Sequence, residues 1–142
     1  MSYATLAQLS ERYGAEVIQS LTDRATPPAG AIDEDVVDRA LADTDAAIDG
    51  YLMRRYALPL ATTPALVVDL ALAIAIYKLH RFVPDDKIKA DYEHAMKTLR
   101  ETAQGIVQLA VEGVEPASSG GSGVQTSDRD RDMTPENMKG FI

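Results

Sequence analysis

The sequence contains no cysteine among its 142 residues. Disulfide bonds, thiolate nucleophiles and cysteine metal sites are therefore excluded, and the composition suits a protein made in a reducing cytoplasm. Positive charge is also scarce, because 14 lysines and arginines stand against 22 aspartates and glutamates, a net charge of -8. This balance opposes general adhesion to nucleic acid or anionic membranes. We therefore do not expect this protein to recognise specific DNA sequences.

Long apolar runs are missing too. The longest, from Ala65 to Tyr77, is interrupted by Asp69 and is shorter than the roughly 20 residues that a membrane-spanning helix needs. We interpret it as a buried core helix. The N-terminus shows no basic segment followed by an apolar one, so we expect no secretion signal.

Patterns that carry chemistry are equally sparse. The two histidines, His80 and His94, fall on different predicted helices and lack a metal-ligand spacing. The glycine-rich stretch at 120–123 neither follows a strand nor opens a helix, so it is not a phosphate-binding loop, and no Ser-His-Asp arrangement is present. We therefore expect no enzyme activity, no metal and no cofactor.

What the sequence does contain is helical periodicity, strongest between residues 33 and 55. Asp33 suits an N-cap, and Glu34 and Asp35 suit the positive end of the helix dipole. Arg54 and Arg55 suit its negative end, so this helix is predicted to extend roughly 33 Å. Its apolar stripe, which should face a core, comprises Val37, Leu41, Thr44, Ile48, Tyr51 and Leu52.

Further helices are predicted on both sides of this central one. Two short helical turns between about residues 5 and 24 should hinge at Gly14. A helix from Thr63-Pro64 to about Phe82 is apolar nearly all round, so we expect its own domain and a neighbouring subunit to share in covering it. A last helix should end at Gly105 in a left-handed cap. Its predicted inward stripe is Ile88, Tyr92, Ala95, Met96, Leu99 and Ala103.

These elements predict an all-α fold, a small helical bundle with two long and several short helices and an extended C-terminal arm. The helical domain should span residues 1–111, followed by a flexible glycine- and serine-rich linker at 112–123. Residues 124–142 would then form a docking arm. Its apolar anchors would be Met138, Phe141 and Ile142, although a disordered end is the alternative.

Acidic side chains mark a second face of the central helix. Asp38, Asp45 and Asp49 line this face. The carboxylates of the whole acidic stretch, which adds Asp33, Asp35 and Asp43, are scattered around the helix instead of converging in a loop, which argues against magnesium binding or acid-base catalysis. A solvated face is the simple interpretation. The functional alternative is a channel lining, on which negative charge lets DNA pass without adhering.

The end of the central helix is a candidate interface. Arg54, Arg55 and Tyr56 could clamp phosphates or a partner's carboxylate, or the arginines could simply complement the helix dipole. Asp69, within the apolar helix, must either be paired or face solvent. Arg81, Lys78 or an arginine on an adjacent helix could be its partner.

Several short segments carry a family resemblance that runs nearly end to end. They are YAT at residues 3–5, ALAD at 40–43, IDGYL at 48–52 and, most specifically, RYALPL at 55–60. In these segments the chain resembles the neck, or head-tail connector, proteins of Mu-like phages and prophages. No catalytic motif accompanies that family, so the resemblance implies an assembly role.

The resemblance implies a ring of copies below the portal of the phage head. The portal is commonly twelvefold in such particles, so the implied number of copies is twelve, a dodecamer. Such a ring joins the head to the tail through contacts with the portal and with a tail or tail-terminator protein. DNA would pass through it without sequence-specific binding. The implied location is the neck of the virion, after synthesis in the host cytoplasm. A small helical protein-binding regulator and a packaging accessory protein are the alternatives.

Overall fold

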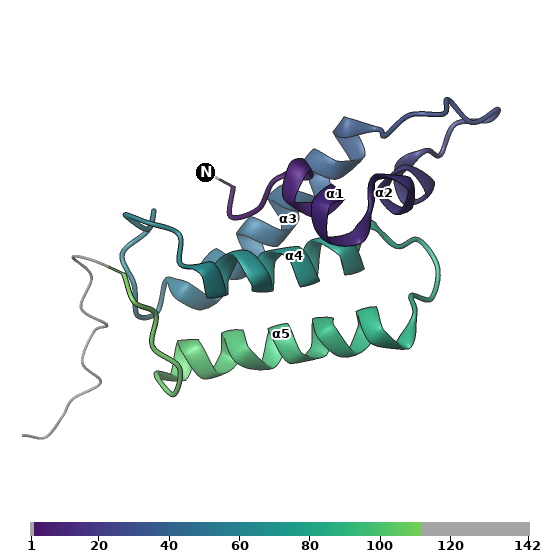
Figure 1. Ribbon diagram of the computed structural model, residues 1–142. Helices are drawn as coiled ribbons and strands as arrows, with labels where there is room; N and C mark the ends of the chain where they lie inside the picture. Colours follow the sequence, from purple (N-terminus) through teal and green to yellow (C-terminus); the bar gives the residue numbers. More distant parts are fainter. Residues whose placement is uncertain (1, 112–142) are drawn as a thin grey trace, which may run out of the picture.

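The computed structural model describes residues 2–111, and within that range the chain folds into five helices without a strand (Figure 1). The all-α prediction is confirmed. The predicted linker at 112–123 and the arm at 124–142, with Met138, Phe141 and Ile142, lie outside the described residues, so they stay predictions. The helices are α1 (Leu6–Tyr13), α2 (Ala15–Thr22), α3 (Glu34–Leu52), α4 (Ala65–Leu79) and α5 (Asp86–Gln104).

Helix α4 lies in the middle of the bundle. It packs against α5 on one side and against α3 and α1 on the other (Figure 1). Every residue from 70 to 76 is buried, which means that the helix is covered around a full turn. The expectation that a neighbouring subunit shares in covering this helix is therefore wrong for most of its length, because α1, α3 and α5 of the same chain do so.

Helix α3 begins where its capping residue predicts. The Asp33 carboxylate accepts hydrogen bonds from the backbone N–H groups of Asp35 and Val36, at 3.1 and 3.4 Å. The helix ends at Leu52, three residues before the predicted end, because the Arg55 N–H bonds to the Leu52 carbonyl and tightens the chain into a turn. Five of the six predicted stripe residues are buried, and Tyr51 is half-buried.

Helices α1 and α2 form the predicted pair of short helices. Gly14, with a φ of 93°, separates them in a conformation that other residues rarely adopt. Thr5 and Gln8 cap the start of α1 reciprocally, each side chain bonding the backbone N–H of the other. Leu9 and Ile18 are fully buried, so the pair is anchored to the bundle through one apolar residue from each helix.

Helix α4 stops earlier than predicted, at Leu79 instead of about Phe82. Side chains satisfy carbonyl groups of its last turns: an Arg24 N–H donates to the Leu79 oxygen at 3.3 Å, and the His80 ring contacts the Ile76 oxygen at 2.7 Å. His80 itself is extended. The chain then leaves the bundle, and Phe82 lies in an exposed loop between α4 and α5.

Helix α5 returns antiparallel to α4 (Figure 1), and the Tyr77 and Tyr92 rings of the two helices stack with their centroids 3.8 Å apart. It ends at Gly105, whose φ of 82° is the predicted left-handed cap. Beyond it the chain turns back irregularly and buries Leu109 and Val111. The Arg55 guanidinium lies directly against Gly105, so the C-terminal ends of α3 and α5 meet.

Replacing Gly105 with alanine should lower the free energy of unfolding by about 1–2 kcal/mol, the cost of a left-handed conformation for a residue with a Cβ. The new Cβ would also overlap the Arg55 guanidinium, which must move aside. Gly50→Ala is the matched control, because a Cβ at Gly50 meets nothing within 4 Å. Urea unfolding measures both variants, and equal stability of Gly105→Ala and the wild type would contradict the prediction.

Candidate functional site

The predicted interface residues Arg54, Arg55 and Tyr56 follow the end of α3 but point into different surroundings. Arg54 is exposed, whereas Arg55 is half-buried beside Gly105. The Nε atom of Arg55 is buried and has no hydrogen-bond partner within the described part of the chain. A cation at the C-terminal end of α5 complements the dipole of that helix. Of the two arginines, Arg54 is therefore the one that is open to a partner.

Tyr56 lies in the domain core, in contrast to its predicted place at an interface. Its side chain is only 5% exposed, and its hydroxyl oxygen accepts a hydrogen bond from the Leu109 N–H at 2.9 Å. The bond joins positions 53 residues apart and holds the returning chain against the bundle. The ring is buried because the turn after α3 directs it inward, which the local sequence does not reveal.

The three acidic candidates on α3 also differ from one another. Asp38 is exposed, whereas Asp45 and Asp49 are half-buried. The Asp45 carboxylate accepts the Tyr3 backbone N–H at 3.0 Å, and the Asp49 carboxylate accepts the Tyr3 hydroxyl. The interpretation of this face as wholly solvated is therefore wrong at two positions, where the carboxylates hold the N-terminal segment against α3.

Burial raises the pKa of the Tyr3 phenol well above its ordinary value, and the hydrogen bond to Asp49 is the second-largest cause of this shift. The neighbouring negative charges of Asp49 and Asp45 act in the same direction. The neutral phenol is thus the form that the folded state favours, since a phenolate would be repelled by both carboxylates.

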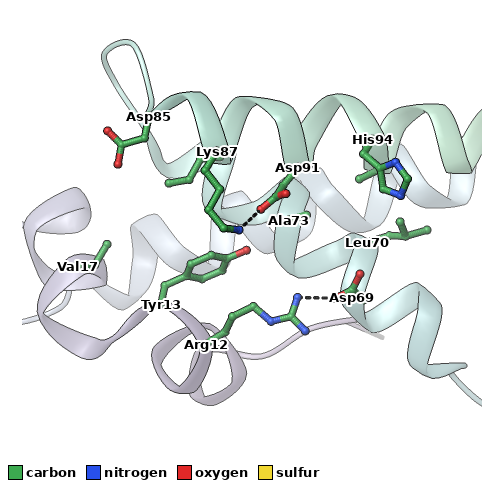
Figure 2. Close-up of a pocket in the computed structure, with 12 residues that line it drawn as sticks. Arg12, Tyr13, Val17, Asp69, Leu70, Ala73, Asp85, Lys87, Asp91 and His94 are labelled. Carbon is green, nitrogen blue, oxygen red and sulfur yellow. Dashed lines mark hydrogen bonds and ion pairs between the residues drawn. The ribbon is translucent and has the colours of Figure 1, made fainter.

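A cavity of about 580 Å³ opens between the α1–α2 pair and the α4–α5 pair. Figure 2 shows Tyr13 pointing into it from the end of α1, between Arg12 and the side chains of α5. Apolar side chains from three helices line it, among them Val17, Leu70 and Ile88. The cavity is thus suited to holding an apolar side chain.

Two ion pairs border this cavity. Arg12 bonds Asp69 at 2.7 Å, and Lys87 bonds Asp91 at 2.7 Å within α5 (Figure 2). The first confirms that an arginine on an adjacent helix pairs with Asp69. Burial raises the pKa of Tyr13, which keeps its phenol neutral. Four of the charged side chains that border the cavity are therefore engaged in pairs, whereas Asp85 forms no ion pair within residues 2–111.

No group of three or more histidine, cysteine, aspartate or glutamate side chains within residues 2–111 gathers to hold a metal ion. His80 and His94, the two histidines, come from the end of α4 and from α5, and only His94 lines the cavity. None of the described helices is both long and apolar enough to cross a membrane.

Exposed apolar side chains mark the two ends of the bundle. Phe82 and Val83 are 84% and 92% exposed in the loop after α4, and we call this pair the α4–α5 tip. Met53 and Ile106 are 68% and 70% exposed where α3 and α5 end, and we call this pair the α3–α5 end. Helical periodicity did not predict either surface, because it extended the two helices to about Phe82 and to Arg55, whereas α4 stops at Leu79 and α3 stops at Leu52.

Comparison with known proteins places these features in a family context. The family described as "Bacteriophage Mu, Gp36" matches residues 3–127. Gene product J of Escherichia phage Mu is 33% identical over 142 residues, an alignment that covers 100% of both chains. The Mu-like prophage FluMu protein gp36 of Haemophilus influenzae is 31% identical over 140 residues, or 99% of this chain and 98% of that one. The predicted resemblance to Mu-like phage and prophage proteins is confirmed.

Replacing Tyr56 with phenylalanine should lower the free energy of unfolding by about 1–3 kcal/mol, because the buried Leu109 N–H loses its acceptor. Tyr92→Phe is the control, since the Tyr92 hydroxyl has no hydrogen bond within the described range. Chemical denaturation measures both variants. Equal effects of the two substitutions would show that the Tyr56 hydroxyl contributes nothing.

The raised pKa of Tyr3 predicts how stability depends on pH. Its contribution should be fully present below the unfolded pKa of about 10 and should be lost as the pH rises above it. The melting temperature of Tyr3→Phe should therefore fall less steeply than that of the wild type above pH 10. Thermal melts followed by circular dichroism test this, and parallel curves for the two proteins would contradict it.

Proposed function

This chain belongs to the Bacteriophage Mu, Gp36 family, and we propose that it acts as a head-tail connector in the neck of the virion. Copies made in the host cytoplasm assemble as a ring below the portal and join the DNA-filled head to the tail. On one side the ring contacts the portal, and on the other a tail or tail-terminator protein. A twelvefold portal would be matched by a dodecamer.

The observation that carries this proposal is the distribution of exposed apolar residues. The four most exposed large apolar side chains among residues 2–111 form the α4–α5 tip and the α3–α5 end. These two surfaces lie at opposite ends of the bundle (Figure 1). An adaptor needs two separate contact surfaces of this kind, because it binds one partner above and another below.

A catalytic role forms no part of the proposal. Around the cavity beside Tyr13, Arg12 is paired with Asp69 and Lys87 is paired with Asp91. The cavity lies on the side of the bundle and is lined by both charged and apolar groups. Binding between proteins uses such surfaces without any reacting group. We propose that this protein is a structural component and not an enzyme.

We further propose that the acidic surface of α3 contributes to the DNA channel of the ring. Asp38 is exposed and has the freedom to face a channel, whereas Asp45 and Asp49 are engaged with Tyr3. Asp38 would therefore carry most of this role. Negative charge repels the phosphate backbone, so that DNA passes without specific binding. The predicted docking arm at 124–142 would add a further contact with the portal or a neighbour.

Aspartate at the α4–α5 tip should weaken binding to one partner by about tenfold or more, because an apolar anchor is lost. The variant is Phe82→Asp with Val83→Asp, and its counterpart at the α3–α5 end is Met53→Asp with Ile106→Asp. Each should affect a different partner, the portal or the tail protein of the same phage. Co-purification of the full chain with each partner measures this.

The matched control is Lys89→Asp with Ala90→Asp, at exposed positions one helical turn into α5 that belong to neither apolar pair. It should leave both interactions unchanged, and all three variants should keep the wild-type melting temperature. If the wild-type chain binds neither partner and sediments as a monomer in their presence, the connector proposal fails. That outcome would favour the alternative of a small helical regulator.

A further inference from the structure

A groove of about 370 Å³ runs along the contact between the C-terminal halves of α3 and α5. Its α3 side is formed by the small residues Ala46, Ala47 and Gly50 together with Tyr51, and two exposed arginines border it. Arg54 comes from the turn after α3, and Arg100 comes from α5. The residues that line the groove include no carboxylate, so it is a basic site in an acidic protein.

Neither arginine is neutralised by an ion pair within residues 2–111. The three ion pairs of that range join Arg12 to Asp69, Lys87 to Asp91 and Lys97 to Glu101. Arg55, the neighbour of Arg54, lies against Gly105 at the end of α5. The guanidinium groups of Arg54 and Arg100 are therefore available to a carboxylate from outside the described domain.

Gly50 supports the interpretation that the backbone of another segment packs closely against α3 at this groove. It lies inside α3, where glycine destabilises a helix relative to alanine. The chain itself does not require glycine there, because an added Cβ would meet nothing within 4 Å. A small residue that is unfavourable for the helix and unnecessary for the bundle is explained if another backbone packs against this side of α3.

The complementary charge lies at the opposite end of the same helix. Asp33, the N-cap of α3, and Glu34 and Asp35 of its first turn are exposed. Twenty residues separate Glu34 from Arg54, or about 30 Å along a helix axis at 1.5 Å per residue. One copy therefore cannot bring its own acidic turn to its own groove, whereas two copies can meet in this way.

We propose that the α3–α5 groove receives the first turn of α3 from a second copy of this chain, so that Arg54 and Arg100 pair with the neighbour's carboxylates. The contact joins two different surfaces, so it repeats from copy to copy and closes into a ring when the rotation permits. The inference rests on the proposed ring and adds its direction, with the start of α3 in one subunit facing the end of α3 in the next.

Charge reversal tests this pairing in the full chain. Arg54→Glu with Arg100→Glu should weaken self-association by about tenfold, since attraction becomes repulsion. Glu34→Lys with Asp35→Lys should have the same effect. Combining all four substitutions should restore association, which a merely structural role of these residues would not explain. Sedimentation velocity of the chain, alone and with its portal protein, measures each mass, and association should fall as salt is added.

Cross-linking then locates the contact, because the natural chain has no cysteine. Ala31→Cys lies just before the acidic turn, and Ala46→Cys lies in the groove; both positions are exposed. A short bis-maleimide should join the two variants when they are mixed, in preference to joining either variant to itself. Ala90→Cys, on an exposed part of α5, is the control and should form no preferred product.

Gly50→Gln gives an independent test of close packing. The variant should melt at the wild-type temperature or a few degrees above it, since glutamine favours helix, yet it should block association. Ala90→Gln should change neither property. If oligomers form but the Ala31–Ala46 cross-link does not, and if the fourfold charge reversal does not restore association, this contact is overturned while the proposed ring is not. A chain that never associates, even with its portal protein, would overturn both.

Discussion

Burial of α4 around a full turn, between residues 70 and 76, is the constraint on which the rest of the structure depends. A helix with seven consecutive buried residues, 70 to 76, needs neighbours on several sides, and each neighbour is positioned by the apolar surface that it covers. Helix α5 takes one side, and α3 and α1 take the other. Asp69, the carboxylate of α4, lies at the edge of this arrangement and is paired with Arg12.

The second organising contact closes the bundle where α3 and α5 end. Tyr56 holds the Leu109 N–H, and Arg55 lies against Gly105. Both contacts join the turn after α3 to the segment after α5, so the ends of the two longest helices are held together. The groove beside Arg54 exists because of this junction, since its two walls come from those same helix ends.

A complete core within one chain changes how assembly should be understood. Residues 70–76 of the central helix are covered within one chain, so the assembly proposed above would use the outer surfaces: the apolar residues at the two ends and the charged groups along α3. Such contacts are smaller and more polar than a shared core. They allow a subunit to fold first and to assemble on its partners afterwards.

The sequence by itself determined the helical class, the cap at Asp33, the hinge at Gly14, the left-handed stop at Gly105 and the Mu-like family. Each of these depends on residues close together in the chain, or on a pattern shared with relatives. Only the tertiary structure decided that Tyr56 is buried, that Asp45 and Asp49 bind Tyr3, and that Phe82 is exposed. Those outcomes depend on contacts between distant segments, some 53 residues apart as for Tyr56 and Leu109, which local periodicity does not encode.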